Sequence, residues 1–217
     1  GSGKSTQIDL VHCHLHQSNK SVKKIWSRGG YTPGFALFKK LFLWALGKRG
    51  SDKKTIHQKN ISYFERRKSL LRYKFVSRIW LFFAILDLIL FYCIYLRILN
   101  IVFNLVLCDR FIHDTKIDFI RNFPSVFNED GWLWRILVCL CPEPKISFVF
   151  TVPVALSQQR AMQKKEPFPD SAPTLEFRLK CYTEWKEFNT PNSVKINGTN
   201  TLGSIEKKIV REIRKKL

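Results

Sequence analysis

Apolar residues recur at helical spacing in the first part of the chain. From residue 5 to about residue 17 an apolar side chain returns every three or four positions, which predicts a helix. The recurring residues are Ile8, Leu10, Val11 and Leu15. The β-prone run at residues 22–26 then predicts a short strand, and a Gly/Pro-rich loop follows it at residues 27–34.

Two continuous apolar runs predict buried parallel strands. Residues 101–108 and 146–152 are rich in β-branched and aromatic side chains, as central parallel strands are, and residues 194–196 form a shorter strand candidate. Helical patterns fill the remaining intervals, at residues 35–46, 114–121, 130–140, 154–164, 175–188 and 202–217. This alternation of strands and helices predicts one doubly wound α/β domain over residues 1–217.

Residues 79–96 admit two interpretations. They hold a single charged residue, Asp87, and they are bracketed by Arg78 and Arg97, so a membrane-spanning helix is one reading. Asp87 would then lie in mid-membrane, at a cost of about 2.5–3.5 kcal/mol. A helix packed between a sheet and its neighbours is also apolar all round. We favour the buried helix, and the membrane span stays open as the alternative.

The chain carries a net charge of +20, much of it in two clusters. One basic stretch lies within residues 48–78, and a second closes the chain within residues 207–216. Such charge suits nucleic acid, an anionic membrane face, polyanionic ligands or simply a solvated surface. Nucleic acid is the least favoured partner, because no aromatic platform motif accompanies the charge. Peripheral docking on a membrane stays open.

The six cysteines follow no zinc-binding pattern. Cys139 and Cys141 are separated by one residue rather than two, and no pair of histidines follows them. The chain also carries a phosphate-binding motif, and enzymes with such a motif work in a reducing, cytoplasmic compartment. We therefore expect free, buried thiols rather than disulfides.

The first six residues carry most of a phosphate-binding motif. Gly3, Lys4 and Ser5 fill the last three positions of the pattern G-x-x-x-x-G-K-[ST]. In such loops backbone N–H groups at a helix N-terminus hold phosphate. The expected nucleotide-binding residues are Gly1, Ser2, Gly3, Lys4, Ser5 and Thr6. The first glycine of the pattern would lie before residue 1, so we expect a fragment that lacks the preceding strand.

A second charged pair stands at the end of a predicted strand. Asp109 and Arg110 directly follow residues 101–108. Open α/β sheets bind their ligands at the carboxyl ends of the strands. The pair is therefore predicted to lie where it can meet a ligand of the phosphate loop.

Together these segments resemble the thymidylate kinase family of P-loop nucleoside-monophosphate kinases. The likeness rests on residues 1–7 (GSGKSTQ), 28–34 (RGGYTPG), 108–111 (CDRF) and 150–161 (FTVPVALSQQRA). The resemblance implies a three-layer P-loop kinase fold, in which a parallel sheet has helices on both faces and a small lid at about residues 157–175. It also implies ATP and Mg²⁺ as cofactors, and phosphoryl transfer to dTMP to give dTDP.

The resemblance assigns nucleotide-binding roles to three residues. Lys4 and the loop amides would hold the phosphates of ATP, and Ser5 would bind Mg²⁺. Asp109 would organise the Mg²⁺ and the acceptor. These roles agree with the physics of phosphoryl transfer, which depends on positioning and on positive charge around the transferred group.

The same resemblance assigns phosphate contacts to three arginines. Arg28 would bind the acceptor monophosphate, and Arg110 would contact phosphate beside Asp109. Arg160, together with Lys164 one helical turn further on, would neutralise charge on the transferring group at the lid.

Two departures from the family leave the acceptor open. The family has an acceptor-binding arginine at a position that falls near residues 87–89, and no arginine is present there. Residues 112–118 do not match the segment that contacts thymine, although His113 and Asp114 remain candidates to face the acceptor. Asp114 suits a helix N-cap equally well. The alternative function is therefore transfer to another small phosphorylated or hydroxyl acceptor, and a homodimer also stays open.

Overall fold

The computed structural model describes residues 3–26, 32, 35, 73–164 and 169–216. Helices alternate with short parallel strands in these residues, which confirms the α/β class expected from the sequence. The chain divides into two compact units. The first comprises Gly1–Trp26, Leu99–His113 and Glu143–Leu217, and the second comprises Ser27–Ile98 and Asp114–Pro142.

The first unit contains four strands, which pair in parallel as β1 with β2 and β3 with β4. They are β1 (Val22–Trp26), β2 (Leu105–Asp109), β3 (Ser147–Thr151) and β4 (Ser193–Asn197). Trp26 lies opposite Asp109, so β1 and β2 end together at one edge. Within the described ranges the strands form two separate two-stranded sheets rather than one continuous sheet.

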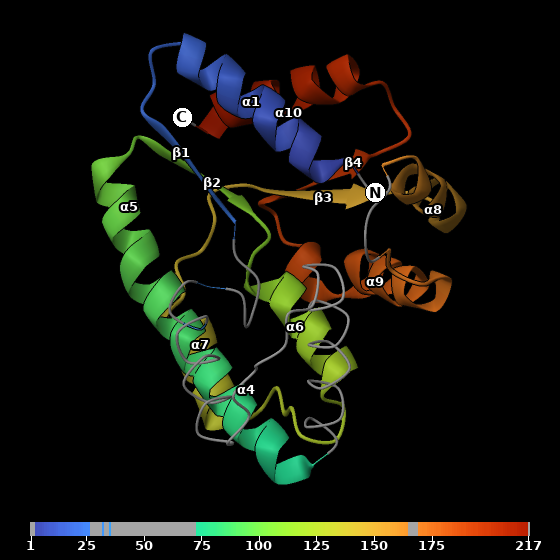
Figure 1. Ribbon diagram of the computed structural model, residues 1–217. Helices are drawn as coiled ribbons and strands as arrows, with labels where there is room; N and C mark the ends of the chain where they lie inside the picture. Colours follow the sequence, from blue (N-terminus) through green and yellow to red (C-terminus); the bar gives the residue numbers. More distant parts are fainter. Residues whose placement is uncertain (1–2, 27–31, 33–34, 36–72, 165–168, 217) are drawn as a thin grey trace, which may run out of the picture. The chain divides into compact units, whose positions relative to one another are not determined.

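Helices pack on the strands of the first unit. They are α1 (Lys4–Gln17), α8 (Val154–Gln163), α9 (Ala172–Glu184), the short 3₁₀ helix η2 (Lys186–Phe188) and α10 (Leu202–Lys216). Figure 1 shows α1 and α10 side by side along the strands, and α9 against β3 on the other side from α10. The apolar core beneath α1 and α10 consists of Val11, Leu15, Val22, Phe150, Ile196, Ile205, Ile209, Val210 and Ile213.

A buried glutamine joins the two outer helices of this core. The Nε2 atom of Gln7 donates a hydrogen bond to the carbonyl of Leu202, at 2.9 Å, where α10 begins. The contact fixes the first turn of α1 against the start of α10. It therefore helps to position the loop residues that precede α1.

The described residues of the second unit are mainly helical. It contains α4 (Lys74–Ile89), the π-helical turn η1 (Leu90–Tyr95), the start of α5 (Leu96–Val102), most of α6 (Ile112–Asn122) and α7 (Trp132–Leu140). Aromatic rings hold α6 and α7 together. The rings of Phe127 and Trp134 meet edge to face with their centroids 5.1 Å apart, and Phe119 lies 5.5 Å from Phe127. Arg97 donates a hydrogen bond to the carbonyl of Leu140, at 3.0 Å.

The helical stretch Lys74–Val102 has two different faces. One face packs inside the protein, with Leu88 fully buried, whereas the other face is exposed and also apolar. The exposed side chains include Phe82, Phe83, Leu86, Leu90, Ile94, Tyr95 and Ile98. Among the described residues packing covers one side of this stretch only, so the expectation of a helix buried all round is not met there. Thr32 donates a hydrogen bond to the Asp87 carboxylate, which gives this mid-helix charge a polar partner.

Two predicted boundaries are also wrong. The strand expected at residues 101–108 begins only at Leu105, because the preceding helix continues to Val102 and the N–H of Phe103 still bonds the carbonyl of Leu99 at 2.9 Å. The helix expected at residues 175–188 breaks at Trp185, whose backbone is extended. Apart from Phe35, the helix expected at residues 35–46 lies outside the described residues.

Candidate functional site

The loop before α1 turns through a glycine. Gly3 has a φ of 78°, in the left-handed region that favours glycine, and it forms the N-cap of α1. No atom lies within 4 Å of a Cβ added there, so the backbone angle, not crowding, selects glycine. The helix begins at Lys4, and its first N–H groups have no partners within the helix. They are therefore suited to hold an anion.

Ser5 and Asp109 meet at the start of α1 and the end of β2. The Ser5 hydroxyl donates a hydrogen bond to Oδ2 of Asp109 at 3.1 Å, although 104 residues separate them in sequence. Asp109 is buried, and β2 holds it there through its pairing with β1. The structure thus brings together the two residues expected to bind Mg²⁺.

These two residues line a cavity of about 240 Å³ in the first unit. Among the described residues, its charged lining consists of Lys4, Asp109, Arg110, Lys164, Asp170 and Arg178. Four cationic side chains thus face two carboxylates, so the cavity has an excess of positive charge. This excess suits a polyanion such as a phosphate chain.

Arg110 adopts an unusual backbone conformation at the edge of this cavity. Its φ is 80°, a left-handed angle that costs a non-glycine residue about 1–2 kcal/mol. Such outliers cluster at functional sites, where the surrounding structure holds them in place. Arg110 comes directly after Asp109, the last residue of β2, and its left-handed backbone turns the chain toward the start of α6.

Lys4 contacts a residue that sequence reasoning missed. Its Nζ donates a hydrogen bond to the hydroxyl of Tyr182 at 3.3 Å and lies 4.7 Å from the centre of the Tyr182 ring. Tyr182 belongs to the buried face of α9, whose members are Thr174, Arg178, Cys181 and Tyr182. An arginine on the buried face of an ordinary amphipathic helix was the signal that could have marked this segment.

The expected residues do not all gather at this cavity. Lys4, Ser5, Asp109, Arg110 and Lys164 line it together with Gly3. Arg160 is not among the lining residues, and its Nη1 atom donates to the carbonyl of Gly198 at 2.9 Å. Thr6 does not line it either. Gly1, Ser2 and Arg28 lie outside the described residues.

The residues after Arg110 pack as part of the protein. The His113 ring lies 5.8 Å from the Phe188 ring and 6.3 Å from the Phe111 ring. Asp114 lies in the first turn of α6. Neither residue lines the cavity, so they add nothing to an acceptor site there.

Cys108 lies next to Asp109 on β2. Burial disfavours its thiolate and raises the pKa of the Cys108 thiol to about 12. No disulfide joins the six cysteines, all of which lie in described parts of the chain. Cys108 is therefore an inert thiol beside the site rather than a nucleophile. The expectation that the thiols are buried is wrong for Cys13 and Cys139, which are exposed.

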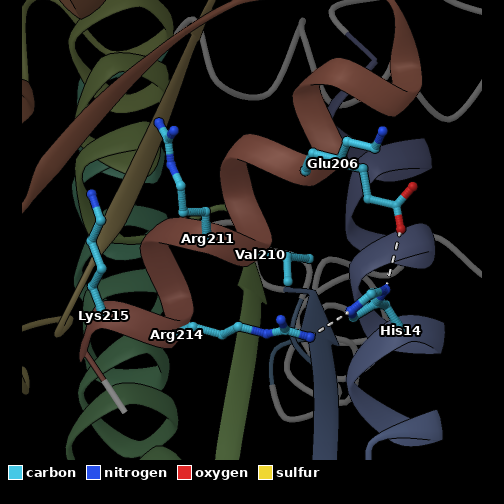
Figure 2. A pocket seen from close by; sticks show the side chains of 7 residues that line it. His14, Glu206, Val210, Arg211, Arg214 and Lys215 are labelled. Atoms are coloured by element: carbon cyan, nitrogen blue, oxygen red, sulfur yellow. Dashed lines mark hydrogen bonds and ion pairs between the residues drawn. The ribbon is translucent and has the colours of Figure 1, made fainter.

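A second cavity, of about 450 Å³, lies between the ends of α1 and α10. Figure 2 shows Arg214 pointing to His14, which also faces Glu206, whereas Arg211 and Lys215 extend away from His14. Arg214 lies 3.3 Å from Nε2 of His14, and both Arg211 and Lys215 pair with Glu212. These cations are engaged by neighbours near helix C-termini, where positive charge is favourable.

The donor atoms at the first cavity suit Mg²⁺. A hydroxyl and a carboxylate oxygen lie 3.1 Å apart, and Mg²⁺ binds proteins through few such ligands while it keeps waters and substrate phosphates. Among the described residues no cluster of three or more His, Cys, Asp or Glu could form an all-protein metal site. Ser5 and Asp109 are thus the residues that could hold a phosphate-bound Mg²⁺.

Comparison with known proteins does not assign the chain to a family. No protein-family model matches the chain, and no curated protein matches it.

Proposed function

We propose that this protein binds Mg-ATP in the cavity at the start of α1 and transfers a phosphoryl group to a small phosphorylated acceptor. The hydrogen bond between Ser5 and Asp109 is the observation that carries the proposal. A phosphate-loop hydroxyl and a strand-end carboxylate are the pair that holds Mg²⁺ in P-loop enzymes. The three-layer P-loop kinase fold and the lid at about residues 157–175 belong to the same proposal.

The protein's own groups account for the binding of a phosphate chain. Backbone N–H groups at the start of α1 and the ammonium of Lys4 hold the phosphates, and Arg110 faces them from the end of β2. Ser5 and Asp109 hold the metal, which when bound neutralises charge on the phosphate oxygens. Lys4 exchanges the Tyr182 hydroxyl for a phosphate oxygen.

The acceptor is a nucleoside monophosphate in this proposal, and dTMP is the first choice because of the family resemblance. The mismatch of residues 112–118 with the segment that contacts thymine favours the alternative, another small phosphorylated or hydroxyl acceptor. His113 in that segment packs against Phe188. This ring is held among aromatic side chains and does not line the cavity. The phosphate chemistry therefore has more support than a thymine pocket.

A cytoplasmic location belongs to the proposal, since ATP is used there. The stretch Lys74–Val102 is long and apolar enough to cross a membrane, with a mean hydropathy of 2.4 in its most apolar window. That test is weak, because core helices pass it as well. One face of this helix packs inside the second unit, whereas the other is exposed and apolar. We therefore propose a helix packed in the protein, with a membrane span as the alternative.

A phosphate-acceptor screen on the full-length protein tests this function. The protein is incubated with Mg-ATP and each nucleoside monophosphate or sugar phosphate in turn, and ADP formation is followed. We expect acceptor-dependent ADP formation, with dTMP first among the candidates. Lys4→Ala should lower turnover by a factor of about 10² or more, because it removes a charge aimed at the transferred group. Near-normal turnover in this variant, or no turnover with any acceptor, would contradict the proposal.

A further inference from the structure

Arg178 is a buried cation in the wall of the candidate ATP cavity. Its side chain is only 9% exposed, and it projects from the middle of α9 on the face that also carries Tyr182. Burial of a guanidinium is costly unless a partner compensates its charge. Its position in the lining, together with Lys4, Asp109 and Arg110, places this charge where an anionic ligand would supply that compensation.

Asp170 is one acidic partner of Arg178. Nε of Arg178 lies 3.5 Å from Oδ2 of Asp170, which exceeds the length of about 2.7–2.9 Å found in tight charge-assisted hydrogen bonds. The Asp170 side chain is 42% exposed, so water can solvate it when the arginine binds another anion.

The position of Arg178 relative to Lys4 indicates which part of a ligand it would meet. Tyr182 lies one helical turn beyond Arg178 on the same face of α9, and its hydroxyl accepts the hydrogen bond from Lys4. Side chains four residues apart on a helix lie about 5–6 Å from each other. Arg178 and Lys4 are thus both neighbours of Tyr182 in the lining of one cavity.

Arg160 does not have this geometry. Its guanidinium is held by the Gly198 carbonyl at the end of β4, at 2.9 Å, and it does not line the cavity. Among the described residues, the arginines that line the cavity are Arg110, at the end of β2, and Arg178, on α9. Arg178 therefore adds a second guanidinium to the one that Arg110 supplies.

We propose that Arg178 binds the terminal phosphate of ATP together with Lys4, and that Asp170 holds it when no nucleotide is bound. This assignment rests on the proposed function and adds a residue to it. A guanidinium can grip two oxygens of one phosphate, whereas a lysine offers a point charge. Arg178 is therefore a selective contact for a triphosphate over a diphosphate.

The test compares ATP and ADP binding by the full-length protein and three variants. The variants are Arg178→Met, Arg178→Lys and the matched control Arg160→Met, and binding is measured by titration with Mg²⁺ present. We expect Arg178→Met to weaken ATP binding at least about tenfold, as loss of a charged hydrogen bond does, and to leave ADP binding nearly unchanged. Arg178→Lys should recover part of the loss, and Arg160→Met should leave the ATP-to-ADP ratio as in the unchanged protein.

The outcomes separate this assignment from the function on which it rests. If the unchanged protein binds neither nucleotide, both proposals fail. If it binds ATP but Arg178→Met alters ATP and ADP equally, or alters neither, only the Arg178 assignment fails. A fourth variant, Asp170→Asn, provides a check that keeps Arg178 in place and so does not depend on the folding of the arginine variants. It removes the carboxylate that competes with ATP for Arg178, and it should therefore strengthen ATP binding severalfold. Weaker ATP binding in Asp170→Asn would also overturn the assignment.

Discussion

Neighbouring residues on β2 have opposite chemical roles. Asp109 accepts a hydrogen bond from Ser5 at the cavity, whereas burial raises the pKa of the Cys108 thiol to about 12. Alternate side chains of a strand point to opposite faces. Asp109 therefore serves the ligand site, whereas Cys108, which is partly buried, points to the other face of the strand.

The raised pKa of Cys108 predicts a loss of stability in alkali. In the unfolded chain the thiol has an ordinary pKa near 9.0, so between pH 9 and 12 the unfolded state loses its proton while the folded state keeps it. The stabilising contribution is complete below pH 9 and is lost as the pH rises through this window. By pH 10 the free energy of unfolding should fall by about 1 kcal/mol from this thiol alone. Urea unfolding at pH 8 and pH 10 measures this fall in the free energy of unfolding.

Cys108→Val is the matched control for this measurement. It keeps an apolar side chain of similar size on β2 but removes the titrating group. Its loss of stability between pH 8 and pH 10 should be smaller than that of the unchanged protein by the same amount. Equal losses in the two proteins would show that Cys108 is not buried as described.

At the scale of elements, local pattern predicted most of the structure of the first unit. The strand at residues 22–26 was predicted to the residue, and α1 and α10 begin and end within one residue of expectation. These elements have clear periodicity and clear ends. The start of β2 could not be predicted, because the apolar residues Ile101 and Val102 suit a helix end as well as a strand.

The candidate site was predictable only in part, because some of its residues belong to local motifs and others reach it only through tertiary packing. The residues Gly3, Lys4 and Ser5 stand in a motif, and Asp109 follows a strand, so spacing alone marked them. Arg178 and Tyr182 reach the cavity through the packing of α9 against β3, and this tertiary contact leaves no motif in the sequence. Arg160 was assigned by resemblance, and its contact with Gly198 depends on the position of β4.

The two faces of α4 and η1 predict different responses to truncation. Leu88 is fully buried, whereas Leu90 is 53% exposed two residues further on. Leu88→Ala should cost about 2–5 kcal/mol of unfolding free energy because it leaves a cavity. Leu90→Ala should change it by only about 0.5 kcal/mol, as surface substitutions do. Urea unfolding of the two variants measures the difference, and equal effects would mean that this helix does not pack on one side as described.

At the scale of the whole molecule, the role of the net charge and the pairing of the strands cannot be predicted from local sequence patterns. The net charge of +20 agrees with a polyanionic ligand, and the cavity at the start of α1 has its own excess of cations. Within the described residues β2 and β3 each pair with one strand only.

The central claim is that Ser5 and Asp109 hold the Mg²⁺ of Mg-ATP, and the Mg²⁺ dependence of ATP binding tests it most directly. ATP is titrated into the full-length protein and into Asp109→Asn, each with Mg²⁺ and with a chelator. In the unchanged protein we expect Mg²⁺ to strengthen ATP binding at least about tenfold, and in Asp109→Asn we expect most of that gain to disappear, because a neutral amide is a weaker ligand for Mg²⁺. ATP binding that does not depend on Mg²⁺, or that keeps its full dependence in Asp109→Asn, would contradict the claim.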